Sequence, residues 1–165
     1  MQLYIVRHGI AIDREDPKCP AEADRYLTEE GIEKTKQVAK GIAALGVQAD
    51  LMVSSPYVRA MQTAAIFASA LKYPEHKIKQ TESLLPGAEP SAFLRELARE
   101  KNASSAFCFG HAPHVDGLLA AVVRAQHPIT SMKKAGVAFL ELKRLSPPNG
   151  QLVWLVTPKL FRKTK

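Results

Sequence analysis

The chain has 165 residues, 46% of them hydrophobic and 24% charged, and this length and composition indicate one globular domain over residues 1–165. No apolar stretch is long enough to cross a membrane, and the start, MQLYIVRHG, lacks the basic leader and long apolar run of a signal peptide, so we expect a cytoplasmic protein with no membrane partner. The net charge of +7 favours anionic partners, but the basic residues are scattered and no nucleic-acid-binding motif occurs, so we do not expect nucleic acid to bind.

The first predicted strand covers residues 3–6, which are apolar at every position. Such a run is typical of a central strand that is buried on both faces of a largely parallel sheet. It ends at RHG, and a polar loop follows over residues 13–25. The stretch LTEEGIEKTKQVAKGIAALG then predicts a helix, because Thr28 is a good amino-terminal cap and acidic residues favour the first turn.

The stretch ADLMVSS predicts a second short strand. Ser55 caps helices well and Pro56 suits a first helical turn, so we expect the second helix to begin there and to end before Pro74. Residues 75–89 predict a short strand and a Pro-Gly loop. PSAFLRELAREK then predicts a third helix.

SSAFCFG predicts a third strong strand, and APHVDGLLAAVVRAQ predicts a fourth helix. GVAFLELKRL and GQLVWLVTP predict two closing strands, with Asn149-Gly150 as a hairpin signal between them. Strands alternate with helices along most of the chain. We therefore expect an α/β fold of three layers, α/β/α, in which a mostly parallel sheet has an antiparallel edge.

Three of the predicted strands end in polar clusters. The first ends in RHG, the second in SSP with an arginine one turn later, and the third in GH. Because ligands of open α/β sheets bind beyond the carboxyl ends of the strands, these clusters should converge. The convergent side chains are those of Arg7, His8, Arg59 and His111. Two guanidinium groups and two imidazoles repel one another unless an anion lies among them, and a phosphoryl group fits that role.

The helix start after His111 favours the same ligand. Ala112 precedes Pro113 and caps a helix poorly, so the N–H groups there, including that of Ala112, are free to bind an anion. Ser55 and His114 are expected either to cap helix starts or to support the residues of the site.

A histidine in such a cluster can act as a base, bind a metal or attack phosphorus. No second ligand lies at metal-binding spacing beside His8, two arginines oppose a cation, and Cys19 and Cys108 form no metal-ligand pattern, so we expect neither a metal nor a cofactor. Attack by a neutral ring nitrogen of His8 is the sharper hypothesis. The carbonyl of Gly9 is placed to hold the other ring N–H.

Three motifs, in this order, carry a family resemblance: RHG, SSPYVRAMQTA and GHAP. Together with LTEEG they resemble the histidine phosphatase superfamily, which has the phosphoglycerate mutase-like fold. The short length and the closing stretches KKAGVAFLEL and LVWLVTPKL look most like its SixA branch of phosphohistidine phosphatases. The resemblance covers nearly the whole chain.

The resemblance implies that His8 is the nucleophile of a phosphatase. It also implies a phosphate pocket, formed by Arg7, Arg59, His111 and the backbone N–H of Ala112. In the wider family a carboxylate that follows the second helix donates a proton to the leaving group. The matching position here is Glu82 in KQTESLLPG.

Larger family members insert a helical cap before the third strand, whereas residues 73–104 contain only one good helix. We therefore expect an open site without a large cap insert, which a folded protein can reach. The leading hypothesis is a metal-independent phosphatase that forms a covalent phosphohistidine and acts on phosphohistidine in a protein. The alternatives are a phosphomonoesterase or mutase acting on a small phosphate ester, and a non-catalytic module that binds phosphate or phosphoproteins.

Overall fold

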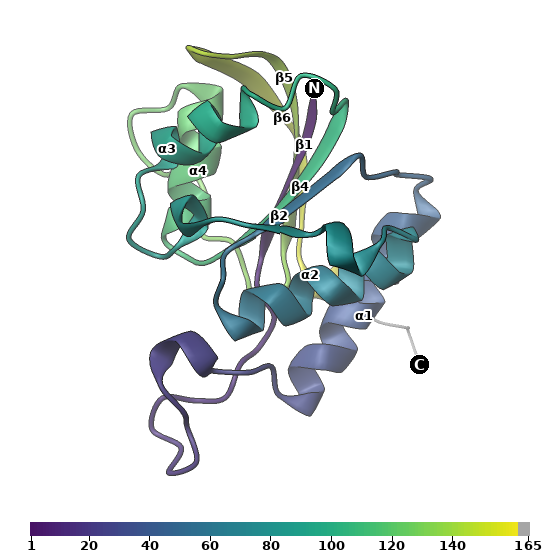
Figure 1. Cartoon of the computed structure of the whole chain (residues 1–165), viewed down its shortest axis with the longest axis vertical. Helices are drawn as coiled ribbons and strands as arrows, with labels where there is room; N and C mark the ends of the chain where they lie inside the picture. The colour runs from purple at the N-terminus through teal and green to yellow at the C-terminus, as the bar shows by residue number, and fades with distance from the viewer. Residues whose placement is uncertain (162–165) are drawn as a thin grey trace.

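The structure, a computed structural model, describes residues 1–161, and in this range one six-stranded sheet lies between two pairs of helices (Figure 1). The strands are β1 (Gln2–Arg7), β2 (Leu51–Ser54), β3 (Lys79–Gln80), β4 (Ser105–Gly110), β5 (Val137–Leu145) and β6 (Pro148–Val156). The helices are α1 (Glu29–Ala44), α2 (Val58–Leu71), α3 (Pro90–Leu97) and α4 (His114–Val123). Short 3-10 turns are η1 (Glu22–Asp24), η2 (Glu75–Lys77), η3 (Glu82–Leu84) and η4 (Pro158–Phe161).

The strand order across the sheet is β3-β2-β4-β1-β5-β6. The first four strands in this order pair in parallel, and β5 and β6 add an antiparallel edge. The predicted α/β class, with a mostly parallel sheet and an antiparallel edge, is therefore confirmed. β1 lies where the parallel and antiparallel parts meet.

β1 is central because its alternate side chains enter two separate cores. Leu3 and Ile5 pack in the core under α3 and α4, whereas Tyr4 and Val6 pack in the core under α1 and α2. All four side chains are nearly or fully buried. Burial of each such side chain stabilises the fold by roughly 1.5–3 kcal/mol, so the end of β1 is held firmly in place.

A row of aromatic rings crosses the middle of the sheet from β4 to β6. The ring of Tyr4 stacks on Phe107 at 4.3 Å and on Phe139 at 4.6 Å between centroids. Phe139 in turn contacts Trp154, the single tryptophan of the chain, at 5.4 Å. Aromatic pairs of this kind each contribute about 0.5–1.5 kcal/mol beyond their buried area, and here they join the parallel strands to the antiparallel edge.

The second and fourth helices begin later than the sequence predicts. α2 begins at Val58 rather than at Ser55-Pro56, because the N–H of Ser55 still bonds the carbonyl oxygen of Phe109 in β4 (2.9 Å) and so continues the line of β2. The hydroxyl of Ser55 bonds His111 and also accepts from the N–H of Tyr57 (3.3 Å). α4 begins at His114, so Ala112 precedes the helix instead of belonging to its first turn.

The hairpin between β5 and β6 also differs from the prediction. Its turn is formed by residues 146–147, and Asn149 and Gly150 lie within β6. A Cβ atom on Gly150 would lie 2.7 Å from Cγ1 of Val122, so glycine is needed there for the close approach of β6 to α4. The Asn-Gly pair therefore serves packing and not the turn.

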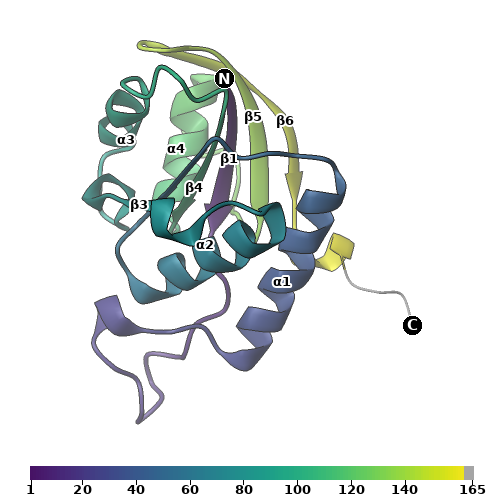
Figure 2. The ribbon, with the colours of Figure 1, turned by 45° about the vertical axis from the view of Figure 1, so that its right-hand side comes forward.

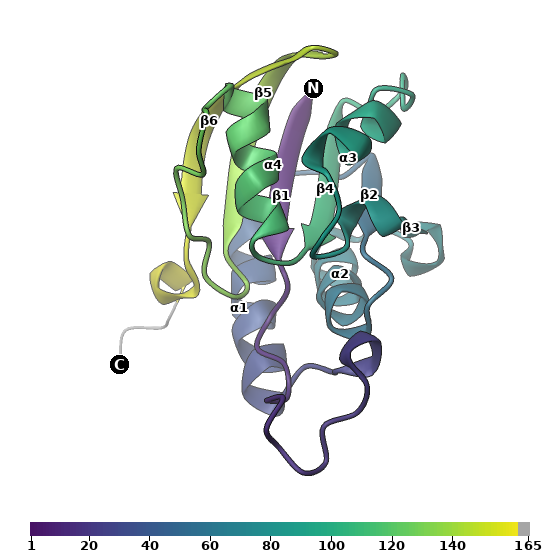
Figure 3. The same ribbon diagram turned by 90° about the vertical axis from the view of Figure 1, so that its left-hand side faces the viewer.

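No large insert covers the carboxyl ends of the parallel strands. Between α2 and β4 the chain forms only β3, two 3-10 turns and α3, which packs beside α4 (Figure 3). Figure 2 shows α1 and α2 together on the other face of the sheet. The loop between β1 and α1 extends beyond the end of β1 (Figures 1 and 3). Across residues 1–161, no helix has the length and apolar character required to cross a membrane.

Candidate functional site

A cavity of about 450 Å³ opens at the carboxyl ends of β1 and β4. The predicted nucleophile and the four residues that the sequence predicts for the phosphate pocket all line it. They are Arg7, His8, Arg59, His111 and Ala112. The expected convergence of the three strand ends is therefore confirmed in position, and the excess of cationic side chains in the wall attracts an anion.

The end of β1 is fixed by the segment that leads into β5. Nη1 of Arg7 donates a hydrogen bond to the carbonyl oxygen of Met132 (2.6 Å), and the N–H of Ala135 lies 3.0 Å from the carbonyl oxygens of both Arg7 and His8. The carboxylate of Asp116 in α4 accepts a hydrogen bond from the N–H of Met132 (2.8 Å). Arg7 and His8 are thus held in place by the protein itself.

The ring of His8 is oriented by the residue that follows it. Its Nδ1 lies 2.7 Å from the carbonyl oxygen of Gly9, so Nδ1 carries the proton and donates, and Nε2 keeps a free electron pair. This contact is the one predicted from the sequence. A Cβ atom on Gly9 would lie 2.5 Å from Oγ1 of Thr35, so only glycine lets α1 pack this close to the site.

His8 is neutral in the folded protein. It is only 8% exposed, and burial lowers the pKa of His8 from 6.5 to about 3. The hydrogen bond to Gly9 opposes this shift, whereas the positive charges of Arg59 and Arg7 add to it. A neutral imidazole with a free Nε2 electron pair is the form that can attack an electrophile.

The guanidinium of Arg59, in the first turn of α2, faces His8. Its Nε–H donates a hydrogen bond to the unprotonated Nε2 of His8 (3.3 Å). Its other two nitrogens donate to Glu22 of η1, one to the carbonyl oxygen (2.7 Å) and one to the carboxylate (2.8 Å). The side chain of Arg59 is 3% exposed, so this planar group is held rigidly against the unprotonated ring nitrogen of His8.

Glu22 joins three arginines around one carboxylate. Arg14 donates two hydrogen bonds of 3.0 Å to it, and Nη1 of Arg25 lies 3.3 Å and 3.4 Å from its two oxygens. Chiefly through the bonds from Arg14, the pKa of Glu22 is lowered to about 2, although burial opposes the shift. The ionised carboxylate therefore ties the loop after β1 to Arg59 on α2.

His111 is supported by Ser55 from the end of β2. Its Nε2 lies 2.7 Å from the hydroxyl oxygen of Ser55, and the two rings of His8 and His111 are 5.1 Å apart between centroids. Burial lowers the pKa of His111 to about 3, and the nearby His8 ring and the positive charge of Arg59 add to this shift. The sequence leaves two roles open for Ser55, capping a helix or supporting the site, and its contact with His111 confirms the second. Both ring nitrogens of His114 are buried without a partner among residues 1–161.

The lowered pKa values predict how stability depends on pH. Burial lowers the pKa of His8, His111 and His114 below 6.5, so the unfolded chain binds more protons than the folded one at mildly acidic pH. The free energy of unfolding should therefore fall as the pH decreases from about 7 to 5. Urea unfolding at several pH values measures this slope. His8→Gln should flatten it, whereas His76→Gln, at an exposed position, should leave it unchanged.

Ala112 and Glu82 differ in their relation to the cavity. Ala112 lines it, and its N–H makes no hydrogen bond within the described part of the chain, so this N–H is available to an anion. Glu82 is exposed on η3 and does not line the cavity, although Pro86 of the same segment does. The structure therefore does not bring Glu82 together with the other five groups, and its role as a proton donor stays a prediction.

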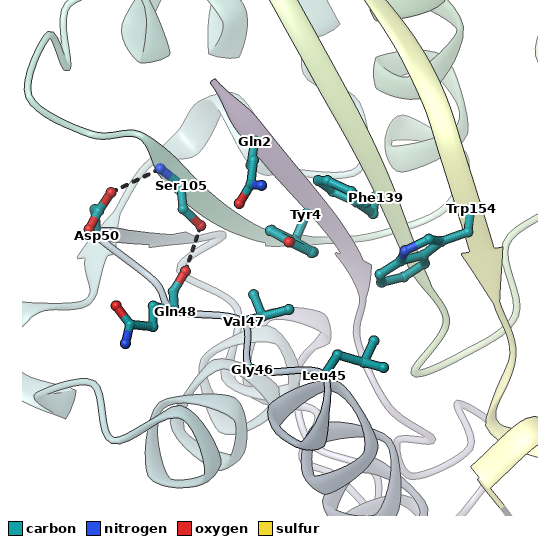
Figure 4. Close-up of a pocket in the computed structure, with 10 residues that line it drawn as sticks. All are labelled: Gln2, Tyr4, Leu45, Gly46, Val47, Gln48, Asp50, Ser105, Phe139 and Trp154. Carbon is teal, nitrogen blue, oxygen red and sulfur yellow. Dashed lines mark hydrogen bonds between the residues drawn. The ribbon is translucent and has the colours of Figure 1, made fainter.

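Residues 1–161 contain no second group of side chains that matches the predicted site. No three His, Cys, Asp or Glu side chains in this range are grouped to hold a metal ion, and burial raises the pKa of the Cys108 thiol. A cavity of about 590 Å³ lies near the opposite ends of the strands, between the Leu45–Asp50 connection and Trp154 (Figure 4). None of the predicted site residues lines it.

Sequence reasoning missed the part of the wall that comes from loops. These residues are Asp13, Arg14, Glu15, Arg25, Pro86 and Lys134. All but Pro86 are charged residues in polar segments, where most such residues are simply solvated, so their type alone carries no signal. The i,i+3 spacing of Glu22 and Arg25 hints at a pair, but not that this pair would reach Arg59.

A model of the histidine phosphatase superfamily (branch 1) matches residues 3–84, which include RHG and the SSPYVRAMQTA motif. The chain belongs to this superfamily and is a phosphatase. The phosphohistidine phosphatase SixA of Escherichia coli is 26% identical over 166 aligned residues, covering 96% of this chain and 94% of SixA. An uncharacterised protein of Picosynechococcus sp. is 35% identical, covering 96% of this chain and 98% of the relative.

A solved structure of the protein histidine phosphatase SixA complexed with tungstate has the same fold. It matches with a TM-score of 0.85 and 25% identity, covering 98% of this chain and 100% of that one. The absence of a large insert and the SixA-like resemblance predicted from the sequence are thus confirmed.

Proposed function

We propose that this phosphatase removes phosphoryl groups from phosphohistidine in proteins, through a phosphoryl group carried on His8. The observation that carries the proposal is the state of His8, a neutral ring whose Nδ1–H is held by Gly9 and whose Nε2 faces Arg59. The neutral ring attacks as it stands, with no base needed to remove a proton first.

In the first step Nε2 of His8 attacks phosphorus, and the bond from phosphorus to the substrate nitrogen breaks. Arg7, Arg59 and the N–H of Ala112 donate to the phosphoryl oxygens and balance their charge. The substrate imidazole leaves with the bond pair, and that nitrogen takes a proton from solvent water in the open cavity. In the second step water attacks phosphorus, the bond to Nε2 breaks, and hydrogen phosphate and neutral His8 are formed. The second proton of this water returns to solvent and balances the proton taken up in the first step.

The position of Glu82 outside the cavity supports a substrate with a good leaving group. A protonated imidazole leaves more readily than an alkoxide and asks less of a proton donor. The open cavity, with no large insert across it, gives a folded protein access to His8. Two similar proteins, a phosphohistidine phosphatase and a protein histidine phosphatase, support the same substrate class.

The test compares turnover of a phosphohistidine protein, a sugar phosphate and an aryl phosphate, each with a chelator present. The proposal expects the highest kcat/KM for the phosphohistidine protein and no loss on chelation. A clear preference for the sugar phosphate would instead favour the small-molecule alternative. Loss of all activity with chelator would contradict the mechanism.

Glu22 is expected to position Arg59. Glu22→Gln removes the charge that pairs with three arginines but keeps the backbone carbonyl that holds Arg59. We expect kcat/KM to fall by about threefold to tenfold, because the ion pair is replaced by a weaker hydrogen bond from the guanidinium to a neutral amide oxygen. Steady-state kinetics measures the change. Glu33→Gln, which removes a surface ion pair with Lys36, is the matched control and should leave kcat/KM unchanged.

A further inference from the structure

One cation of the cavity wall has no partner. Arg14, Arg25 and Arg59 share the carboxylate of Glu22. Lys134 also lines the cavity, is exposed, and makes no side-chain hydrogen bond or ion pair with any of residues 1–161. The wall includes two carboxylates, those of Asp13 and Glu15, and neither is within ion-pair distance of Lys134. The ammonium group of Lys134 is therefore available to a ligand.

The backbone around Lys134 is held in a costly conformation. Ala135 has a φ of +60°, which places a residue with a Cβ atom in the left-handed region. Its N–H bonds the carbonyl oxygens of Arg7 and His8, and the carbonyl of Gly136 accepts from the N–H of Arg7 (3.1 Å). These bonds fix the segment directly against the end of β1. Strained backbone persists where the surrounding structure holds it, often at ligand sites.

The phosphoryl group does not need Lys134. Arg7, Arg59, His111 and the N–H of Ala112 already surround the position next to His8. The cavity of about 450 Å³ is several times larger than a phosphoryl group, so it also holds the part of the substrate that lies beyond phosphorus. The charge of Lys134 also contributes to lowering the pKa of His8, so it acts on the same cavity.

We propose that Lys134 binds a second anionic group of the substrate, a carboxylate side chain next to the phosphohistidine. This inference rests on the proposed function and names the class of protein that it acts on, one with an acidic residue beside the phosphorylated histidine. Lys134 is then a specificity-determining residue. Because the pair that it forms lies at an open rim, its effect should weaken as salt is added.

The test uses three phosphohistidine peptides that differ only in the residue next to the phosphohistidine, which is Glu, Gln or Lys. The wild-type enzyme should prefer Glu over Gln, and Gln over Lys, by about threefold to tenfold each in kcat/KM. Lys134→Gln should remove this order, Lys134→Glu should reverse it, and Lys134→Arg should keep it. Lys133→Gln is the matched control, because Lys133 is exposed but does not line the cavity, and it should also keep the order.

An equal loss on all three peptides in Lys134→Gln, or no preference in the wild-type enzyme, would overturn the inference. Failure of the proposed function would give a different result: the enzyme would hydrolyse aryl phosphates but none of the phosphohistidine peptides. In that case the role of Lys134 is tested with two aryl phosphates, one with a carboxylate on its ring and one without. A preference for the carboxylate that Lys134→Gln removes would support the inference, and equal rates in the wild-type enzyme would overturn it.

Discussion

Replacement of His8 by alanine should reduce turnover on the order of ten-thousandfold or more. His8 provides the only nitrogen that the proposed mechanism uses to attack phosphorus, so its removal removes the covalent step. Turnover of a phosphohistidine peptide measures the loss. In the wild-type enzyme, rapid acid-free quenching should trap a phosphoryl group that is stable to base and labile to acid, and His8→Ala should trap none.

Two controls separate this chemistry from folding. His76→Ala changes an exposed histidine outside the cavity and should keep full turnover. His8→Gln fills most of the space of the ring, so its free energy of unfolding shows that the fold persists while turnover is lost. A His8→Ala enzyme that retained even a hundredth of the wild-type rate would contradict the role of His8.

Replacement of Arg59 by alanine should lower kcat/KM by about a hundredfold to a thousandfold. Arg59 places Nε next to Nε2 of His8, where the transferred phosphoryl group would lie, so its loss removes a donor to the charge that develops in the transition state. Arg59→Lys should recover only a small part of the loss. A lysine keeps the charge but cannot donate from a planar fork to both Glu22 and the phosphoryl group.

Arg95→Ala is the matched control for Arg59→Ala, because Arg95 is exposed on α3 and bonds only Ser91. Inhibition by inorganic phosphate provides a second measurement, and its inhibition constant should rise in Arg59→Ala but not in Arg95→Ala. An Arg59→Ala enzyme that bound phosphate as tightly as the wild-type enzyme would place the phosphoryl group elsewhere in the cavity.

The sequence predicts the fold and the four central side chains because both depend on local patterns. Apolar runs identify the strands, and RHG and GH mark where β1 and β4 end, which the parallel sheet then brings together. Helix starts were predicted less well. The rule that serine caps a helix places the start of α2 too early, because the backbone N–H of Ser55 is still bonded to Phe109 of the neighbouring strand β4.

The remaining wall of the site could not be predicted because it depends on loop conformation. Glu22 reaches Arg59 across 37 positions in the chain, and nothing in the local sequence specifies how the loop after β1 folds back to α2. Lys134 precedes Ala135, whose positive φ is a conformation that propensity rules assign to glycine instead. The hydrogen bonds to β1 that hold this turn are contacts between distant segments.

The aromatic row across the sheet includes an intrinsic fluorophore that can be used to follow unfolding. Trp154 is its single tryptophan and packs on Phe139 at the edge of the sheet, and it does not line the cavity that contains His8. Its emission therefore depends on whether β5 and β6 remain docked and is insensitive to occupancy of the site. Unfolding of the variants at His8, Arg59 and Lys134 can thus be followed by fluorescence in the presence of phosphate, with no correction for a signal from binding.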